Sequence, residues 1–431
     1  MTISAEAEVE ATPARSKTRP AQPPETPPEH AVSGLLDVAG SSAFVRTAGF
    51  RPGPDDVFVP AALIKQYGLR RGDQIDGAAR PPGTSGQARN GQARNGEARN
   101  GEARNGEARN GQARDREKRA TLTRVDTVNA IPAARAMNRP AFDGLTPLYA
   151  DQRIRLEAGS ASPAARIIDL VSPIGRGQRG LIVSPPKAGK TELLKEIAAA
   201  ITLGDPGLHL MMVLVGERPE EVTDIRRSVR GEVVSSTFDH GAQEHIMVAE
   251  LAIERAKRLV ELGRDVVVLL DSITRVARAY NLVAPATSRI LAGGVATSAL
   301  QPPRAFLGAA RNVEYGGSLT ILSTALIETG SRMDDVFFEE FKGTGNMELR
   351  LRRDLAEKRL FPAIDVAASS TRREDLLMTP DEYAASGKLR RGLSGLDAQQ
   401  ALELLLDQTR DTSSNAEFLL QVQGADSHAR R

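Results

Sequence analysis

The sequence predicts an α/β domain with a mostly parallel sheet and helices on both faces, preceded by a small all-β barrel. Two observations support this prediction. Short strand-like segments separated by turn residues occupy residues 32–129, and alternating strand-like and helix-like segments occupy residues 161–422. With 431 residues, of which 40% are hydrophobic, the chain is long enough to bury two separate cores.

The composition limits the classes of function. The chain contains no cysteine, which excludes disulfides and thiolate metal sites and is compatible with a cytoplasmic protein. Its net charge is only +2, so binding to nucleic acid must come from local basic patches. No apolar run reaches the roughly 18 residues of a membrane span, so no membrane partner is expected. Residues 1–31, which carry six prolines and no signal-peptide core, are expected to be a disordered leader, and residues 423–431 a disordered tail.

Five segments within residues 32–129 have the length and composition of β-strands, and turn signals such as Pro-Gly-Pro-Asp-Asp at 52–56 separate them. Five short strands in one small unit indicate a barrel. The OB fold is the small barrel most used for nucleic acid, although periodicity alone does not separate it from an SH3-like barrel. The expected strands are residues 34–38, 43–46, 57–59, 74–79 and 122–128.

A low-complexity insert at residues 83–119 interrupts this barrel. The unit Gly-Gln/Glu-Ala-Arg-Asn repeats over residues 86–114, with six arginines against three glutamates. A five-residue period fits neither helix nor strand, and no apolar residue larger than Ala occurs in the repeat, so a solvated loop is expected. The repeat is either an inert spacer or a flexible arginine arm that contacts phosphates without sequence preference.

Residues 130–160 are expected to be a linker, and beyond them strand and helix patterns alternate. The run 265–271 has the continuous apolar character of a parallel strand buried on both faces. Ligands of such sheets bind outside the carboxyl ends of the strands, which is where a site is expected. The expected strands are 180–183, 209–215, 232–236, 265–271, 318–325 and 347–351, and the expected helices are 192–198, 219–229 and 244–262.

Residues 184–191, Ser-Pro-Pro-Lys-Ala-Gly-Lys-Thr, lie between a predicted strand and a predicted helix. They match the phosphate-loop pattern G-x-x-x-x-G-K-[ST] except that Ser184 replaces the first Gly. In this context backbone N–H groups bind phosphate oxygens, Lys190 reaches the β- and γ-phosphates, and Thr191 offers its hydroxyl to Mg²⁺. The sequence therefore predicts a nucleoside-triphosphate site. Its candidate residues are Lys187, Ala188, Gly189, Lys190, Thr191 and Glu192.

Two carboxylates lie at the ends of predicted strands next to this loop. Asp271 ends the strand 265–271, where a carboxylate can hold Mg²⁺ through water, although it can also cap the following helix. Glu217 follows the strand 209–215 and can polarise the water that attacks the γ-phosphate. Alternatively, Glu217 is an acidic residue favoured by the dipole of the helix that follows.

Residues 161–380 resemble the ATPase domain of the bacterial transcription termination factor Rho family. The resemblance covers most of residues 34–405 and implies a RecA-like P-loop ATPase domain that uses ATP and Mg²⁺, joined to an RNA-binding barrel. It further implies a homohexameric ring that loads on single-stranded RNA, moves 5′ to 3′ and releases RNA polymerase from its elongation complex. The strings that carry the resemblance are residues 173–180 (PIGRGQRG), 185–191, 217–223 (ERPEEVT), 269–275 (LLDSITR), 308–314 (GAARNVE), 341–349 (FKGTGNMEL) and, in the barrel, 52–56 and 68–73.

The resemblance also assigns roles to single residues of the ATPase domain. Glu217 matches the catalytic glutamate, and Asp271 matches the Mg²⁺ carboxylate. Arg372 matches an arginine finger supplied by the neighbouring subunit. Arg218 and Arg359 match positions that help to sense the γ-phosphate. Phe361 matches the aromatic residue that packs on adenine. For each arginine the alternative is a surface salt bridge.

Two segments match the central-pore loops that grip RNA in this family. The first is residues 285–295, with Arg289 and a flexible Gly-Gly pair. The second is residues 329–332, where Arg332 stands at a position that is usually Lys. Arginine keeps the charge but binds phosphate with a different geometry. The alternative is a glycine-rich turn with an incidental basic residue.

The barrel departs from the family pattern. Gly-Phe-Gly-Phe-Leu-Arg is here Ser-Ser-Ala-Phe-Val-Arg at 41–46, which keeps Phe44 and Arg46 and loses one aromatic, while Phe50 stands where an aromatic is expected. The aromatic pair expected after residue 118 is replaced by Arg119 and Ala120. Stacking contributes about 1–3 kcal/mol per base, so a weakened primary RNA site is expected.

Two functions follow from these observations. The first is an RNA-dependent ATPase and helicase that terminates transcription, and the second is an RNA-binding regulator or paralogue with weak or vestigial ATPase. The altered barrel and Gly216, which replaces the acidic residue that usually precedes the catalytic glutamate, are both departures from the family; the barrel favours the second function, whereas Gly216 leaves the reaction intact and affects only its fine tuning. The complete set of phosphate-site residues favours the first. A rotary or secretion ATPase on the same fold is disfavoured by the barrel and the RNA-loop strings.

Overall fold

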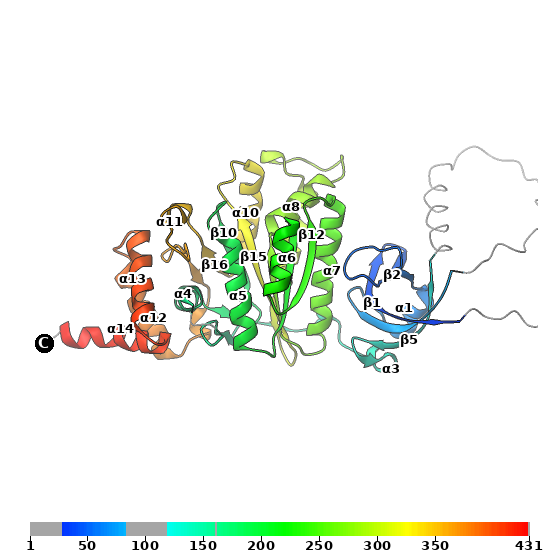
Figure 1. The fold of residues 1–431 in the computed structure, drawn as a ribbon, viewed down its shortest axis with the longest axis horizontal. Coiled ribbons are helices and arrows are strands. Elements are labelled where there is room, and N and C mark those ends of the chain that lie inside the picture. The colour runs from blue at the N-terminus through cyan, green and yellow to red at the C-terminus, as the bar shows by residue number, and fades with distance from the viewer. Residues whose placement is uncertain (1–27, 83–118, 160–161, 430–431) are drawn as a thin grey trace, which may run out of the picture.

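The computed structural model describes residues 28–82, 119–159 and 162–429. A β-barrel lies at one end of the molecule, a large sheet with helices on both faces lies in the middle, and helices α12–α14 lie at the other end (Figure 1). None of the helices in the described ranges combines the length and the apolar character that a membrane span requires.

The N-terminal barrel has the strand order β3-β2-β1-β4-β5-β6, and β3 also pairs with β5 through Phe58 and Thr121. This pairing closes the sheet, and α1 lies between β3 and β4. The closed five-strand order is that of an OB fold, which resolves the choice between OB and SH3-like barrels and confirms the five predicted strands. The elements are β1 (His30–Ala39), β2 (Ser42–Arg46), β3 (Val57–Phe58), α1 (Ala61–Tyr67), β4 (Gln74–Arg80), β5 (Thr121–Val128) and β6 (Ile131–Pro132).

The barrel has its own core because alternate residues of its strands point inward. Leu36, Val45, Ile75 and Leu122 are among its fully buried members. β1 begins at His30, slightly before the expected start of the barrel. The repeat at 86–114, the rest of the insert to residue 118 and the expected leader over residues 1–27 lie outside the described residues.

The segment 130–160, expected as a linker, is packed against both domains. The backbone N–H of Phe142 donates to Glu261 Oε1 at 2.8 Å, and the Phe142 ring is buried in the core of the α/β domain. One short strand of this segment joins the large sheet and another forms a separate pair. The elements are α3 (Ala133–Ala136), η1 (Phe142–Gly144), β7 (Pro147–Leu148), which pairs with β14, and β8 (Arg153–Ile154), which pairs with β9 (Ile174–Gly175).

The large sheet has the order β12-β11-β13-β15-β10-β16-β17. The first six strands in this order are parallel to one another. This confirms the mostly parallel sheet and the six strands predicted for it. The strands are β10 (Arg179–Ser184), β11 (His209–Glu217), β12 (Glu232–Thr237), β13 (Val266–Asp271), β14 (Arg311–Val313), β15 (Ser318–Leu326), β16 (Met347–Arg350) and β17 (Ser370–Thr371).

Each face of this sheet is buried under a different set of helices. Ile182 and Met212 face a core that includes α4, α5, α6 and α13, whereas their neighbours Leu181 and Met211 face a core formed with α7 to α10. The helices are α4 (Pro163–Val171), α5 (Lys190–Gly204), α6 (Pro219–Ser228), α7 (Ala242–Val260), α8 (Ile273–Leu282), η2 (Ala292–Gly294), η3 (Thr297–Ala299), α9 (Gln301–Gly308), α10 (Arg332–Thr344), α11 (Arg353–Glu357), η4 (Glu374–Leu376), α12 (Pro380–Leu393), α13 (Ala398–Asp411) and α14 (Asn415–Ala429).

The C-terminal helices are attached to the α/β domain through buried Arg166. Its guanidinium donates to the Thr412 carbonyl at 2.6 Å and to Asn415 Oδ1 at 3.1 Å, which orients the turn between α13 and α14. The side chain of Gln423 donates to the Asp381 carbonyl at 3.0 Å and ties α14 to α12. Because of these contacts α14 continues to Ala429, so the segment 423–429 is helical rather than the disordered tail expected from the sequence.

Charged side chains connect the barrel to α7. Arg71 donates to Asp37 of β1 at 2.9 Å and to Glu250 of α7 at 2.8 Å. Arg255 of α7 donates in turn to Asn129 Oδ1 at 2.7 Å. The barrel therefore contacts the helix that covers one face of the ATPase-type sheet.

Candidate functional site

The predicted phosphate loop lies between β10 and α5, as expected. Gly189 is the N-cap of α5 and has φ +84°, and a Cβ at this position would lie 3.2 Å from the Phe361 ring. Glycine is therefore required both by the backbone conformation and by the close approach. The first N–H groups of α5 have no intrahelical acceptors, so the helix N-terminus can bind phosphate oxygens.

Lys190, the first residue of α5, lies between the two predicted carboxylates. Its Nζ donates to Asp271 Oδ1 at 2.5 Å and to Glu217 Oε1 at 3.3 Å. The two acids end neighbouring strands, since Leu214 of β11 is in register with Asp271 of β13. The structure thus brings Lys190, Glu217 and Asp271 together at the carboxyl edge of the sheet.

Asp271 is completely buried, and its two oxygens have different surroundings. Oδ1 accepts hydrogen bonds from Lys190 and from Thr324 Oγ1, the latter at 2.8 Å. Oδ2 is buried and has no hydrogen-bond partner among the residues that the structure describes. A buried carboxylate oxygen without a donor suits a hard cation or a water bound to one, and Thr191 is adjacent to Lys190 in the same loop.

Glu217 is 4% exposed and also lies 3.3 Å from the guanidinium of Arg275 on α8. Burial raises the pKa of its carboxyl, and the charge of Asp271 adds to this effect, while Lys190 and Arg275 oppose it. A raised pKa makes this carboxylate a better proton acceptor, which suits a general base. Arg275 was not singled out from the sequence, although it lies one helical turn past the strand end that contains Asp271.

An apolar pocket of about 350 Å³ lies beside the phosphate loop. Phe361, which is 48% exposed, lines it with Leu351 and Pro362. The predicted phosphate-loop residues Ala188, Gly189 and Glu192 line the same pocket. A flat ring at the rim of an apolar pocket next to a phosphate site is suited to packing against a nucleobase.

The three arginines expected at the γ-phosphate, Arg218, Arg359 and Arg372, are all exposed. Arg218 borders a different hollow that it shares with Gly216 and Arg275. Arg359 has a left-handed backbone with φ +61°. Arg372 follows β17, which pairs with the first residues of β16, so it lies at the amino edge of the sheet while Lys190 lies at the carboxyl edge.

The two predicted pore segments lie against each other. A Cβ at Gly293, which has φ +79°, would lie 2.9 Å from the backbone carbonyl oxygen of Arg332. Arg289 and Arg332 are both exposed. The structure therefore places these two basic side chains on adjacent segments, as a shared nucleic-acid surface requires.

One helix connects these segments to the phosphate site. α8 begins next to Asp271, and its residues Arg275, Arg278 and Asn281 follow one another at intervals of three. Arg275 contacts Glu217, Arg278 pairs with Asp334 at the start of α10, and the Asn281 side chain binds the backbone of Gly294 and Ala296 at 3.1 and 2.7 Å. A movement of α8 would therefore change its contact with Glu217 as well as its contacts with the two predicted pore segments.

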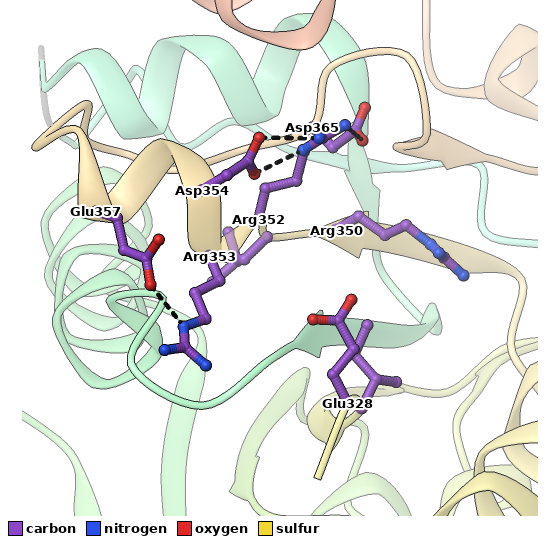
Figure 2. Close-up of a pocket in the computed structure, with 9 residues that line it drawn as sticks. Glu328, Arg350, Arg352, Arg353, Asp354, Glu357 and Asp365 are labelled. Atoms are coloured by element: carbon purple, nitrogen blue, oxygen red, sulfur yellow. Dashed lines mark hydrogen bonds and ion pairs between the residues drawn. The ribbon is translucent and has the colours of Figure 1, made fainter. Parts of the chain in front are cut away.

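A second cavity, of about 610 Å³, shares Leu351 with the apolar pocket beside the phosphate loop. Figure 2 shows Arg350, Arg352 and Arg353 from the end of β16 and the start of α11; Arg352 points toward Asp354 and Asp365, Arg353 points toward Glu357, and Glu328 lines the same cavity. The three guanidiniums have carboxylate partners within the described chain, namely Glu348, Asp354, Asp365 and Glu357. The charges that line this cavity are thus largely compensated. The cavity extends from Leu351, which also lines the apolar pocket beside the phosphate loop, to Glu328, which precedes the second predicted pore segment.

The barrel residues expected to bind RNA are not equivalent in the structure. Phe44 is half-buried on β2, and the Arg46 guanidinium lies 5.5 Å from its ring centre. Arg46 itself is buried and donates to both Asp37 and Asp56. Phe50 packs against the core of the α/β domain and not beside Phe44. A partly exposed guanidinium next to Phe44 is that of Arg119, which the sequence showed only as a departure from the family.

A strand–phosphate loop–helix unit with a lysine and two carboxylates at strand ends, on a RecA-like parallel sheet, defines a P-loop nucleotide-binding domain. Residues 164–371 match the family model described as the ATP synthase alpha/beta family, nucleotide-binding domain. Residues 32–133 match the Rho termination factor, RNA-binding domain. The chain belongs to the transcription termination factor Rho family.

Curated relatives named transcription termination factor Rho align with most of the chain. The protein of Micrococcus luteus is 59% identical over 391 residues, and that of Streptomyces lividans is 58% identical over 392 residues. These alignments cover 91% of this chain but only 54% and 52% of the relatives, so the chain spans about half their length. The protein of Streptosporangium roseum is 53% identical over 412 residues, which are 95% of this chain and 97% of the relative.

Solved structures of secretion ATPases share the fold of the α/β domain. One is a prototypical ATPase from the type III secretion system of pathogenic bacteria, with 25% identity and a TM-score of 0.54 over 65% of this chain and 86% of that chain. The assembled ATPase EscN from enteropathogenic E. coli has the same identity and TM-score over 66% of this chain and 73% of that chain.

Proposed function

We propose that this chain is an ATP-dependent, RNA-stimulated hexameric helicase or translocase that terminates transcription by moving 5′ to 3′ on nascent RNA. The observation that carries the proposal is α8. It contacts the catalytic candidate Glu217 at one end and holds the pore segments at the other. In this proposal the single helix α8 connects the site where ATP is hydrolysed to the segments that hold RNA.

In this proposal the N–H groups at the start of α5 and the Lys190 ammonium bind the phosphates, and Phe361 packs on the adenine. Glu217 orients the attacking water and accepts its proton. Thr191 and the free Oδ2 of Asp271 would hold Mg²⁺, which would neutralise phosphate charge when bound. Lys187, Arg218 and Arg359 would add positive charge around the phosphates.

The position of Arg372 supports a ring of identical subunits. The residue lies at the sheet edge away from Lys190 of its own chain, so in this proposal it stabilises the transferred phosphoryl group of a neighbour. The related EscN structure is described as assembled, which favours oligomerisation of the same fold here. RNA polymerase in its elongation complex would be the partner from which RNA is released, and the cytoplasm is the expected location.

An RNA-binding regulator with weak ATPase is the second candidate. Gly216 and the altered barrel face favour it, because both depart from the family at or next to functional residues. The compact set of Lys190, Glu217 and Asp271 favours an active enzyme instead.

The two candidates differ in ATP hydrolysis, which can be measured on the full chain with and without a pyrimidine-rich RNA. Hydrolysis that rises strongly on addition of RNA, and that is absent in Lys190→Ala, supports the translocase. Release of transcripts from stalled elongation complexes would then test termination directly. A parent chain that binds RNA but shows no RNA-dependent hydrolysis would favour the regulator.

A further inference from the structure

Asn346 joins the segment that carries the predicted arginine finger to strand β10. β17 pairs with β16 through Thr371 and Met347, and just beyond this pair the backbone N–H of Arg372 donates to the Asn346 carbonyl at 2.8 Å. The backbone N–H of Asn346 donates in turn to the carbonyl of Arg179, the first residue of β10, at 2.9 Å. The backbone of the finger is therefore fixed to the sheet through a single residue.

The side chain of Asn346 reinforces this connection. Its Oδ1 accepts a hydrogen bond from the backbone N–H of Arg179 at 2.8 Å and another from Gln178 Nε2 at 2.7 Å. Gln178 Nε2 also donates, at 3.1 Å, to the Asn346 carbonyl, which is the group that binds the Arg372 N–H. Gln178 is 1% exposed, so these hydrogen bonds are shielded from water.

Arg372 and the next residue, Arg373, differ in what holds their side chains. The Arg373 guanidinium pairs with Asp375 at 3.0 Å and lies 5.3 Å from the centre of the Tyr149 ring. The side chain of Arg372 is exposed, and it forms no ion pair within residues 28–82, 119–159 and 162–429. The direction in which the finger leaves the subunit thus depends on its backbone, which Asn346 holds.

A second positive charge lies near the finger. The Arg179 guanidinium donates to the carbonyls of Thr344 and Ala310 at 3.0 and 3.2 Å, and it has no carboxylate partner in the part of the chain that the structure describes. Burial, and then the charges of Arg311 and Arg372, lower the pKa of Arg179. Because like charges repel, conformations in which the Arg372 guanidinium points away from Arg179 are favoured.

We propose that Asn346 is a positioning residue for the finger Arg372, and that Asn346 and Gln178 form a clamp that sets where the finger leaves the subunit. The inference rests on the proposed function, in which the finger acts on the phosphoryl group bound by a neighbour. The clamp fixes the finger's backbone, and repulsion from Arg179 turns its guanidinium outward. A displacement of about 1 Å at such a contact can slow a reaction by about 100-fold, so the clamp affects catalysis without touching ATP.

Substitutions on both sides of the clamp test the proposal in the full chain. Asn346→Ala removes the oxygen that accepts from Arg179 and Gln178, and Gln178→Met removes the donor at a similar side-chain length. Asn415→Ala is the matched control, because the Asn415 side chain is also tied to a buried residue but lies at the turn between α13 and α14. The measurements are RNA-dependent hydrolysis, binding of a fluorescent ATP analogue, thermal unfolding, and ring assembly by native mass spectrometry.

We expect kcat to fall by about tenfold or more in Asn346→Ala and in Gln178→Met, while the affinity for the ATP analogue stays within about twofold of the parent. The affinity should persist because Lys190 and the phosphate loop are unchanged. The double variant should be no slower than the slower single variant, since both substitutions open the same clamp. Asn415→Ala should lose thermal stability and keep the kcat of the parent.

Mixed rings show on which subunit the clamp acts. Mixing Asn346→Ala with Lys190→Ala subunits should raise hydrolysis above the average of the two, because some interfaces then combine an intact phosphate loop with a well-placed finger. Mixing Asn346→Ala with Arg372→Ala subunits should give no such gain, since every finger in these rings is defective. A loss of stability alone does not distinguish the two mixtures.

Hydrolysis at the parent rate in both Asn346→Ala and Gln178→Met would overturn the proposal. The same gain in the two mixtures, or none in either, would also overturn it, provided that Arg372→Ala mixed with Lys190→Ala does regain activity. No gain in that last mixture, in rings that have exchanged subunits, would instead overturn the finger in trans, and the inference with it. If Asn346→Ala does not assemble into rings, Gln178→Met takes its place in both mixtures.

Discussion

The α/β domain and the barrel have retained their ligand-binding residues to very different degrees. In the α/β domain Lys190, Glu217 and Asp271 are in place and in mutual contact. In the barrel, by contrast, the predicted RNA-binding residue Arg46 is buried in ion pairs, and Phe50 packs against the α/β domain. The ring of Phe44 contacts the guanidinium of Arg119.

The difference follows from what each ligand demands. A triphosphate site needs a cation and two carboxylates from separate strands within about one hydrogen-bond length, and removing one leaves a buried charge uncompensated. A stacked base needs only a flat polarizable surface, which an aromatic ring and a guanidinium both provide. The barrel can therefore exchange residues that the phosphate site cannot.

The largest effect should come from Glu217→Gln, which tests whether the α/β domain is catalytically intact. The amide keeps the shape of the side chain but cannot accept the proton of the attacking water, so RNA-dependent ATP hydrolysis should fall by about 100-fold or more. Nucleotide binding should persist, because Lys190 and the phosphate loop are unchanged. Steady-state hydrolysis and binding of a fluorescent ATP analogue measure the two quantities.

Glu220→Gln is the control for this substitution, because Glu220 is an exposed acid in the first turn of α6 and forms no ion pair among the residues that the structure describes. The variant should leave the charges next to Glu217 unchanged. It should hydrolyse ATP like the parent. Hydrolysis at the parent rate in Glu217→Gln would show that another group activates the water.

Mixed rings test whether the phosphate site is completed by a neighbour. Arg372→Ala and Lys190→Ala subunits should each be inactive alone, and mixing them should restore part of the activity because some interfaces then combine an intact phosphate loop with an intact finger. Hydrolysis is followed as a function of mixing ratio, with subunit exchange confirmed by mass spectrometry. Inactivity at every ratio in rings that have exchanged would contradict a finger in trans.

The parts of the fold predicted most accurately are those with a strong local pattern. The run 265–271 and the strand–loop–helix around Lys190 are legible because buried parallel strands are continuously apolar and glycine marks the phosphate loop. Arg275 and Thr324 escaped prediction, because each reaches Glu217 or Asp271 only through the packing of separate elements.

A third, intermediate effect concerns Arg275 and the pH dependence of catalysis. Burial and the charge of Asp271 raise the pKa of Glu217, and Arg275 partly opposes them. A general base must be ionised, so activity falls as the pH drops through this pKa. Arg275→Gln removes an opposing positive charge, raises the pKa further and should move the acid limb of kcat/KM to higher pH.

Arg275→Lys is the matched variant, since it retains the charge near Glu217 and should keep the acid limb close to that of the parent. The pH profile of kcat/KM is the readout, because it reports groups of the free enzyme and is insensitive to a uniform loss of active protein. An acid limb that moves equally in both variants, or in neither, would exclude this electrostatic role.

The strands of the barrel were predicted correctly, but the surroundings of two predicted RNA-binding residues, Arg46 and Phe50, could not be predicted from the sequence. Sequence indicates that Arg46 is basic and lies beside an aromatic, but not that Asp37 and Asp56 converge on it from other parts of the barrel. Phe50 likewise looks like a stacking residue until the contact with the α/β core is seen. Linker packing around Phe142 is a third case, since it depends on Glu261 far along the chain.

The smallest effect is expected from the repeat insert, which lies in the sequence between β4 and β5 of the barrel. Arg80 at the end of β4 pairs with Thr121 at the start of β5, and Thr121 is in register with Phe58. A short glycine linker between residues 82 and 119 should therefore replace the insert without breaking this pairing. The repeat contains six arginines that can contact phosphates without sequence preference, so its deletion should lower RNA affinity modestly.

The control for the deletion is a full-length chain in which the six repeat arginines are replaced by glutamine. If charge is what the insert contributes, both variants should flatten the dependence of log K on log salt, by about 0.7 for each lost phosphate contact, and leave base preference unchanged. If only the deletion weakens binding, the length of the insert contributes to RNA affinity and the charge of its arginines does not. Unchanged affinity and slope in both variants would show that the repeat is an inert spacer that contributes nothing to RNA binding.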